Sequence, residues 1–165
     1  MSAPQFQLAQ VNIARMRGGL SSPIMQSMAS RIDEMNQLAE RSKGFVWRAR
    51  GADVTGEMLL VFEGYVVPFE PERLFYNMSV WESLEDLRQY AFKSAHTEML
   101  HERRQWMVDF DRASLAMWWI MPGQFPTVAE SARRLRAVQE RGPTSFAFTF
   151  AQSYPPTVTG NEGTP

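Results

Sequence analysis

The stretch LFYNMSVWESLEDLRQYAFKSAHTEML, residues 74–100, contains the two consecutive elements on which the fold prediction depends. Residues 74–81 are rich in aromatic and aliphatic side chains, which favours a β-strand. Ser83 and Asp86 have the spacing of a capping box, which marks the start of a helix. We expect this helix to run to about residue 108, because apolar residues recur along one side of it at helical spacing: Leu87, Ala91, Ala95, Met99 and Trp106.

An earlier stretch, residues 6–16, predicts a first strand. Its apolar and polar side chains alternate, as the two-residue repeat of a strand requires. Val11 and Ile13 would lie on one face, and Gln10 and Asn12 on the other. The face that carries Gln10 and Asn12 is therefore expected to meet a polar cavity.

Between this strand and residue 74 the sequence predicts a helix and further strands. Ser22 is the expected N-cap of the helix, which would end at Gly44. Residues 45–50 read as the second strand. Residues 58–67 are also strand-like. They form either a hairpin with 74–81 or part of one strand with a wide excursion, and the sequence leaves both arrangements open.

The C-terminal third predicts a strand over 114–121, a helix from a capping box at Thr127 to Arg141, and a short strand over 146–150. The first six elements have the order strand, helix, strand, strand, helix, strand. This is the order of a ferredoxin-like α+β unit, here with an extra C-terminal helix and strand.

We expect one domain over residues 1–150. The Pro-, Gly- and Thr-rich segment 151–165 is expected to be a disordered tail. A ferredoxin-like unit packs its helices on one face of the sheet, and a second subunit commonly covers the other face. The fold therefore predicts a homodimer.

The composition excludes several classes of function. The 165 residues carry a formal charge of −1, so neither nucleic acid nor an anionic membrane is an expected partner. The absence of cysteine excludes disulfides, thiolate metal sites and a cysteine nucleophile. No signal peptide or membrane span is recognisable, which predicts a cytoplasmic location. An aromatic fraction of 12% and eleven methionines fit either a softly packed core or a pocket for a flat, apolar ligand.

The chain has two histidines, His96 and His101, both on the predicted second helix. Five residues separate them, whereas two ligands on one helix face need a separation of three or four, so no metal site is expected. His96 would lie at the edge of the apolar stripe, as a structural histidine or as a proton-transfer group. Arg103, on the same flank, would either hold an anionic group of a substrate or pair with surface charges.

The block NMSVWESLEDLRQYAFKSAHTEMLHERRQWM (77–107) resembles the central motif of dimeric α+β barrel proteins, a superfamily that includes antibiotic biosynthesis monooxygenases. Within it, the chain is most similar to the family known as domain of unknown function 3291. Three other stretches match that family: LAQVNIARMR (8–17), GFVWR (44–48) and the long C-terminal stretch 115–150. Gln124 stands where members often have histidine, which puts in doubt any function that needs a histidine there.

The resemblance implies a small apolar pocket, dimerisation and an enzyme of natural-product biosynthesis. The leading hypothesis is cofactor-independent monooxygenation, or a proton-transfer cyclisation or isomerisation, of an aromatic or polyketide-like substrate. His96 would be the general acid or base, Asn12 would orient the substrate or an oxyanion, and Tyr90 is a further catalytic candidate. Arg103 would help to bind the substrate. Three tryptophans would either form the apolar walls of the pocket or pack only in the core: Trp47, Trp81 and Trp119.

Two alternatives stay open. The heme-degrading members of the superfamily use an asparagine, an aromatic residue and a histidine, which Asn12, Tyr90 and the Ala95–His96 step resemble; the implied protein would bind heme with His96 as its axial ligand. The other alternative is a dimer that binds a small apolar ligand without turning it over.

Overall fold

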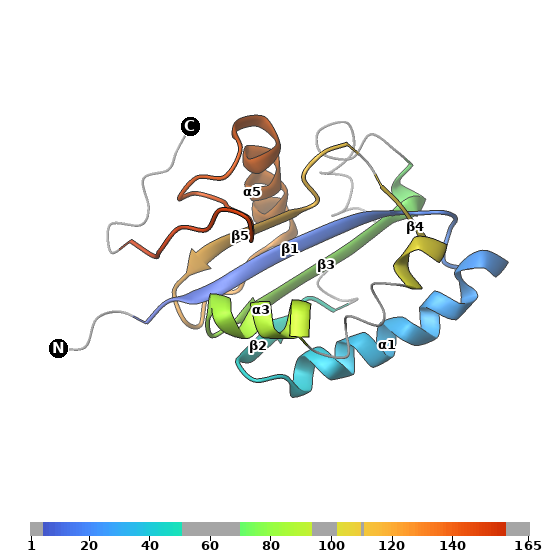
Figure 1. Ribbon diagram of the computed structural model, residues 1–165, viewed down its shortest axis with the longest axis horizontal. Helices are drawn as coiled ribbons and strands as arrows, with labels where there is room; N and C mark the ends of the chain where they lie inside the picture. The colour runs from blue at the N-terminus through green and yellow to red at the C-terminus, as the bar shows by residue number, and fades with distance from the viewer. Residues whose placement is uncertain (1–4, 51–69, 94–101, 110, 158–165) are drawn as a thin grey trace.

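The computed structural model describes residues 5–50, 70–93, 102–109 and 111–157 (Figure 1). Three α-helices and five strands make up its regular structure in these ranges: β1 (Gln7–Met16), α1 (Gln26–Arg41), β2 (Phe45–Arg48), β3 (Leu74–Trp81), α3 (Leu84–Lys93), β4 (Met107–Val108), β5 (Leu115–Ile120) and α5 (Val128–Arg141). Single 3-10 turns occupy Pro23–Met25, Pro71–Arg73 and Arg103–Gln105. The predicted strand over 58–67 lies outside the described residues.

The strands form one antiparallel sheet in which β1 is central. β3 pairs with β1 along its length, with Asn12 opposite Asn77, and β2 lies outside β3. On its other side β1 pairs first with β5 and then, at its C-terminal end, with the short β4. The order β2-β3-β1-β5 is that of a ferredoxin-like α+β unit, so the predicted fold class is confirmed.

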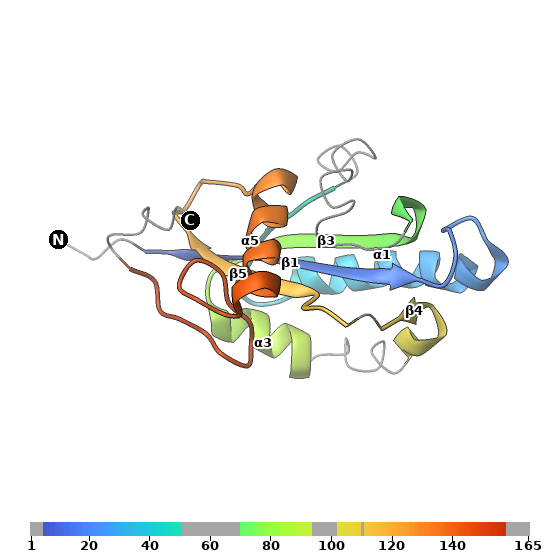
Figure 2. The same ribbon diagram turned by 90° about the horizontal axis from the view of Figure 1, so that it is seen from above.

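The two faces of the sheet pack against different helices. Side chains alternate along a strand, so Leu8 points toward α1 and α3, where it packs with Ala39 and Leu87. Val11 lies on the opposite face and packs with Leu135 of α5. We call these surfaces the α1/α3 face and the α5 face; Figure 2 shows α3 and α5 on opposite sides of the sheet. The face expected to await a second subunit is thus packed by α5 of the same chain.

The predicted second helix is wrong at its C-terminal end. Residues 103–105 form a 3-10 turn, and Met107 and Val108 pair with Met16 and Arg15 at the end of β1. Trp106, which lies between the 3-10 turn and β4 in the sequence, is buried against Met28 of α1 and Met25 of the preceding 3-10 turn. Pairing with the open edge of β1 satisfies these backbone groups and brings Trp106 under α1, which a continuing helix would not do. Residues 94–101, which include His96 and His101, lie outside the described residues.

Helix caps follow the sequence at two of three positions. Ser83 Oγ accepts a hydrogen bond from Asp86 N at 3.1 Å, and Thr127 Oγ1 accepts one from Glu130 N at 3.1 Å, as their capping boxes predict. Ser22 is the exception. Its hydroxyl donates to the Gly19 carbonyl at 2.6 Å, and a 3-10 turn separates it from α1.

The predicted strand over 146–150 is reduced to one antiparallel bridge between Met117 and Phe148. On both sides of this bridge the backbone bonds locally instead: Thr144 N donates to Ala147 O at 2.8 Å, and Thr149 N donates to Gln152 O at 3.3 Å. Within the predicted tail, Tyr154 accepts a hydrogen bond on its carbonyl from Trp119 Nε1 at 2.7 Å. Residues 158–165 lie outside the described residues.

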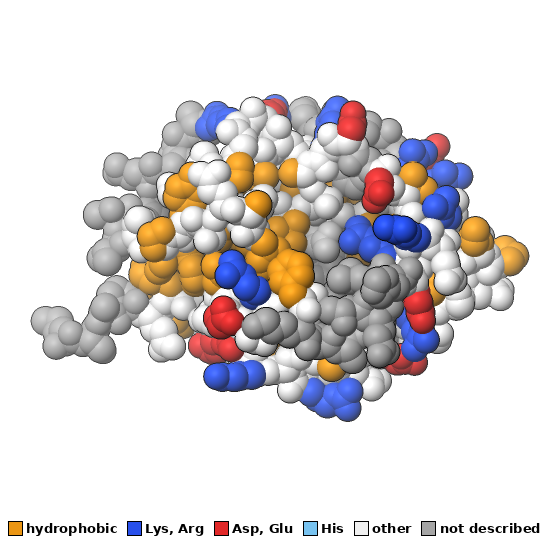
Figure 3. All heavy atoms as spheres, viewed as in Figure 1, with side chains coloured by type: hydrophobic (Ala, Val, Ile, Leu, Met, Phe, Trp, Pro, Cys, Tyr) orange, Lys and Arg blue, Asp and Glu red, His pale blue; other side chains and the backbone are white. Residues whose placement is uncertain are grey.

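Figure 3 shows hydrophobic side chains gathered on the face over α3 and the C-terminal segment. Phe92 of α3 is 52% exposed, and its ring meets that of Phe150 edge-on with centroids 5.0 Å apart. No helix among the described residues is long and apolar enough to cross a membrane.

Candidate functional site

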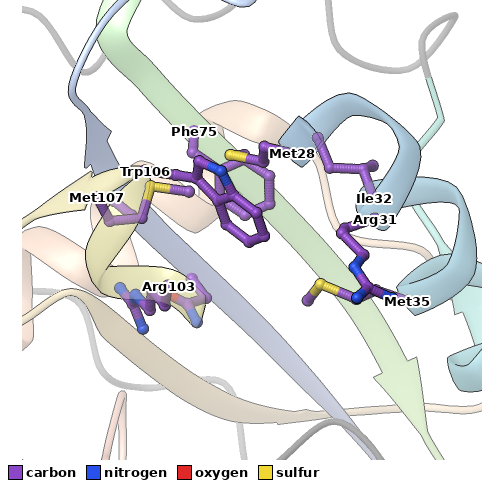
Figure 4. Close-up of a pocket in the computed structure, with 10 residues that line it drawn as sticks. Met28, Arg31, Ile32, Met35, Phe75, Arg103, Trp106 and Met107 are labelled. Atoms are coloured by element: carbon purple, nitrogen blue, oxygen red, sulfur yellow. The ribbon is translucent and has the colours of Figure 1, made fainter. Parts of the chain in front are cut away.

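A cavity lies on the α1/α3 face between α1, the sheet and the segment 103–107 (Figure 4). It encloses about 570 Å³ of empty space, part of it open to solvent. We call it the methionine cavity, because three methionines line it. Its apolar lining residues are Ala14, Met28, Ile32, Met35, Phe75, Trp106 and Met107. Thioethers and aromatic rings are adaptable, polarizable walls that suit a flat, apolar ligand.

Two contacts hold the segment 102–106 against α1. Trp106 Nε1 donates to Ser27 Oγ at 3.0 Å. Arg31 lines the cavity and donates to Glu102 Oε1 at 3.1 Å, while its other terminal nitrogen reaches Glu34 at 2.8 Å. Because its guanidinium is paired with two carboxylates, we regard Arg31 as part of the wall of the methionine cavity.

Asn12 and Arg103 also line the methionine cavity, and their polar groups are not consumed by the fold. Asn12 comes from the centre of β1, where strand alternation directs it away from the α5 face. Within the described ranges, neither side chain takes part in a hydrogen bond or ion pair. A carboxamide and a guanidinium beside an apolar cavity can bind the oxygen atoms of a ligand or an oxyanion.

A second cavity adjoins the first along the same face and encloses about 400 Å³, again partly open to solvent. We call it the asparagine cavity after Asn36 and Asn77, which line it with Ser79, Arg48 and the aromatic rings of Phe45, Trp81 and Tyr90. Ile32, Met35 and Phe75 line both cavities. The two spaces are therefore separated by only a thin set of side chains.

The floor of the asparagine cavity is a hydrogen-bonded polar network on β1 and β3. Gln10, which is 5% exposed, donates from Nε2 to Asn77 Oδ1 at 2.7 Å and to Ser79 Oγ at 2.8 Å. Trp81 Nε1 donates to the same Ser79 oxygen at 2.9 Å. These bonds fix the orientation of the floor side chains below the cavity.

Tyr90 enters the asparagine cavity from α3. Its ring stacks on Trp81 with centroids 5.0 Å apart, and its hydroxyl donates to the Met35 carbonyl at 3.3 Å. Burial raises the pKa of Tyr90 to about 12. At neutral pH it is therefore a phenol that can donate a hydrogen bond, and it is poorly suited to act as a base.

The predicted site residues do not all meet. The structure brings Asn12 and Arg103 to the methionine cavity and Trp81 and Tyr90 to the adjoining asparagine cavity. His96 lies outside the described residues, so its role as acid, base or heme ligand stays a prediction.

Two of the predicted tryptophans line neither cavity. Trp47 packs on the α5 face, with its ring centroid 5.2 Å from that of Phe125. Trp119 lies on the α1/α3 face but packs toward Phe148, with its indole nitrogen bonded to Tyr154. Both are accounted for by packing in the structure.

Sequence reasoning missed Asn77, Ser79 and the methionines of α1 as lining residues. A signal for the first two was present: in the strand 74–81 they alternate with Met78 and Val80, so a polar and an apolar face were readable. Nothing in the sequence indicated that α1 would lie above this polar face. In the part of the chain that the structure describes, no three His, Cys, Asp or Glu side chains gather as metal ligands do.

A comparison with curated proteins finds no match. Among solved structures, the chain is similar to SnoaB, a cofactor-independent oxygenase from Streptomyces nogalater, with a TM-score of 0.43 and 14% sequence identity over 74% of this chain and 97% of SnoaB. So distant a likeness transfers no activity. The sequence itself matches a family along nearly its whole length. From residue 7 to residue 162 it fits the domain of unknown function DUF3291, and the chain belongs to that family.

Proposed function

We propose that the methionine cavity is the active site of a small-molecule enzyme that acts on an aromatic or polyketide-like substrate. The reaction is a cofactor-independent monooxygenation or a proton-transfer cyclisation or isomerisation. The observation that carries this proposal is the pairing of an apolar cavity with Asn12 and Arg103, whose polar groups have no partner among the described residues. Both side chains are half-buried, so water satisfies them when the cavity is empty and a ligand that displaces this water can take its place as their partner.

Both reactions pass through an electron-rich substrate anion. A base removes a proton from a phenol or an activated CH₂ group, and the guanidinium of Arg103 stabilises the resulting oxyanion in a partly desolvated cavity. The Asn12 carboxamide orients the same oxygen. His96 is proposed as the base, since the unperturbed pKa of a histidine suits proton transfer near neutrality.

In the oxygenation, the substrate supplies all the electrons. The anion reacts with O₂, a CH₂ group becomes C=O, one oxygen atom enters the product and the other leaves as water. In the cyclisation or isomerisation, the anion attacks or shifts within the substrate and recovers its proton from the same base. Oxygen consumption therefore separates the two reactions.

The test is turnover of a panel of aromatic phenols and polyketone-bearing aromatics, followed by product mass in air and under anaerobic conditions. Arg103→Met should lower kcat/KM roughly a hundredfold, as expected for loss of one group that stabilises an oxyanion. His96→Ala should lower kcat at unchanged thermal stability.

Arg104→Met is the matched control, because Arg104 is the exposed neighbour in the same turn and lines neither cavity. It should retain wild-type turnover. Equal activity of the Arg103 and Arg104 variants would show that the methionine cavity is not where the reaction occurs.

A further inference from the structure

The polar floor beneath the two cavities has a definite direction of hydrogen bonding. Gln10 uses both hydrogens of its amide, one on Asn77 Oδ1 and one on Ser79 Oγ, at 2.7 and 2.8 Å. Ser79 Oγ accepts a further bond from Trp81 Nε1 at 2.9 Å. Both lone pairs of Ser79 Oγ and one of the two on Asn77 Oδ1 are thus occupied from within the sheet. The hydrogens left to face a ligand are the Nδ2 hydrogens of Asn77 and the hydroxyl hydrogen of Ser79.

These donors lie next to the methionine cavity. Asn77 is the cross-strand partner of Asn12, which lines that cavity. Directly opposed residues on one face of an antiparallel pair have Cβ atoms about 4.5–5.5 Å apart. The two carboxamides therefore form one continuous polar strip that passes from one cavity floor to the other.

The partition above this strip is built from apolar side chains. Ile32 and Met35 descend from α1, Phe75 rises from β3, and all three line both cavities. The unbranched Met35 side chain can change rotamer at little cost. A planar ligand seated on Phe75 can extend past Met35 from one cavity into the other.

We infer that the ligand of this site spans both cavities, with apolar rings in the methionine cavity and a carbonyl or oxyanion oxygen bound by Asn77 and Ser79. This inference rests on the proposed function and adds the substrate class, which is an elongated planar molecule with a ring carbonyl or oxyanion as hydrogen-bond acceptor. A ligand without that acceptor leaves the two donors unpaired when it displaces water, and this lowers its affinity.

Calorimetric titration with three carboxylates tests the inference: naphthoate, fluorene carboxylate and fluorenone carboxylate. The last two have the same rings and charge and differ in one carbonyl. Fluorenone carboxylate should bind about tenfold more tightly than fluorene carboxylate, the size of effect expected for one hydrogen bond to a buried donor. Naphthoate fills one cavity and should bind most weakly.

Asn77→Asp removes the Nδ2 donor and keeps the oxygen that accepts from Gln10. An aspartate still offers an oxygen to Gln10 but replaces the Nδ2 donor by an anionic oxygen, so the preference for fluorenone carboxylate should vanish or reverse. Gln37→Glu makes the same amide-to-acid change on the exposed side of α1 and should keep the preference.

The outcomes are distinguishable. Equal affinities of fluorene and fluorenone carboxylates overturn the inference, while weakening of all three by Arg103→Met would leave the proposed function standing. A tenfold preference that survives Asn77→Asp also overturns it, because the ligand carbonyl would then be bound by a donor other than Asn77. If none of the three binds, the inference fails, and the turnover panel with Arg103→Met decides the proposed function separately.

Discussion

At the scale of single residues, burial and hydrogen bonding determine what the chemistry-bearing side chains can do. Tyr90 has the right neighbours for catalysis, but its raised pKa limits it to the role of a donor near neutral pH. Asn77 would be an ordinary strand residue without Gln10, whose hydrogen bond fixes which side of its amide is free. The role of each side chain therefore follows from its neighbours more than from its type.

The pKa of Tyr90 predicts how stability depends on pH. In the unfolded chain the phenol ionises near pH 10, and in the folded protein at about 12. The folded state thus holds the proton more tightly, and this contribution to stability is complete below pH 10 and is lost as the pH rises toward 12. Urea unfolding between pH 9 and 12 should show a smaller loss of stability in Tyr90→Phe than in the wild type.

Tyr76 provides an internal comparison, since burial also raises its pKa above the ordinary value. Its share of the alkaline destabilisation should persist in Tyr90→Phe. A variant whose stability falls as steeply as that of the wild type would contradict the raised pKa of Tyr90.

At the scale of elements, α5 is an integral layer of the fold. Its buried side packs on the α5 face of the sheet through Val128, Ala132, Leu135 and Val138, and Thr127 caps its start. The segment 103–108 shapes the α1/α3 face. Its last two residues pair with β1, and this pairing places Arg103 and Trp106 at the methionine cavity.

Leu135→Ala tests the role of α5 in stability. The side chain is fully buried, at 0% exposure, so its truncation leaves a cavity and should lower the free energy of unfolding by about 2–5 kcal/mol. Denaturant unfolding gives the value. Arg133→Ala, on the exposed side of the same helix, is the matched control and should change stability by less than about 0.5 kcal/mol. Similar small effects of both changes would mean that α5 is not packed on the sheet.

At the scale of the whole molecule, the sheet carries helices on both faces. A second subunit is expected to cover a face of the sheet that the chain leaves open, but α5 occupies that face over β1, β3 and β5. A dimer that forms through the α5 face would have to use the part of the sheet that α5 leaves uncovered, or the outer side of α5 itself.

The homodimer stays a prediction, and light scattering at a series of protein concentrations measures it. We expect twice the mass of the 18.9 kDa chain. Arg133→Glu reverses a charge on the outer side of α5 and should leave that mass unchanged if the outer side of α5 is not the interface. A monomeric mass at every concentration would contradict the prediction.

The sequence by itself determined the elements that local physics controls. Alternation along residues 6–16 defined the first strand and its two faces, the aromatic and aliphatic composition of residues 74–81 indicated another strand, and the capping boxes at Ser83 and Thr127 located two helix starts. These signals depend on neighbours a few residues away. The same order of elements predicted the ferredoxin-like arrangement.

The tertiary structure alone decided what lies above each face. Trp47 and Trp81 are both aromatic strand residues, yet the sheet sends one to the α5 face and the other to the asparagine cavity. The descent of 103–108 onto β1 depends on an open strand edge contributed by a segment about ninety residues earlier. Long-range pairing and packing energies of this kind leave no local periodicity, so the cavities and the donors on their floor could be found only in the folded chain.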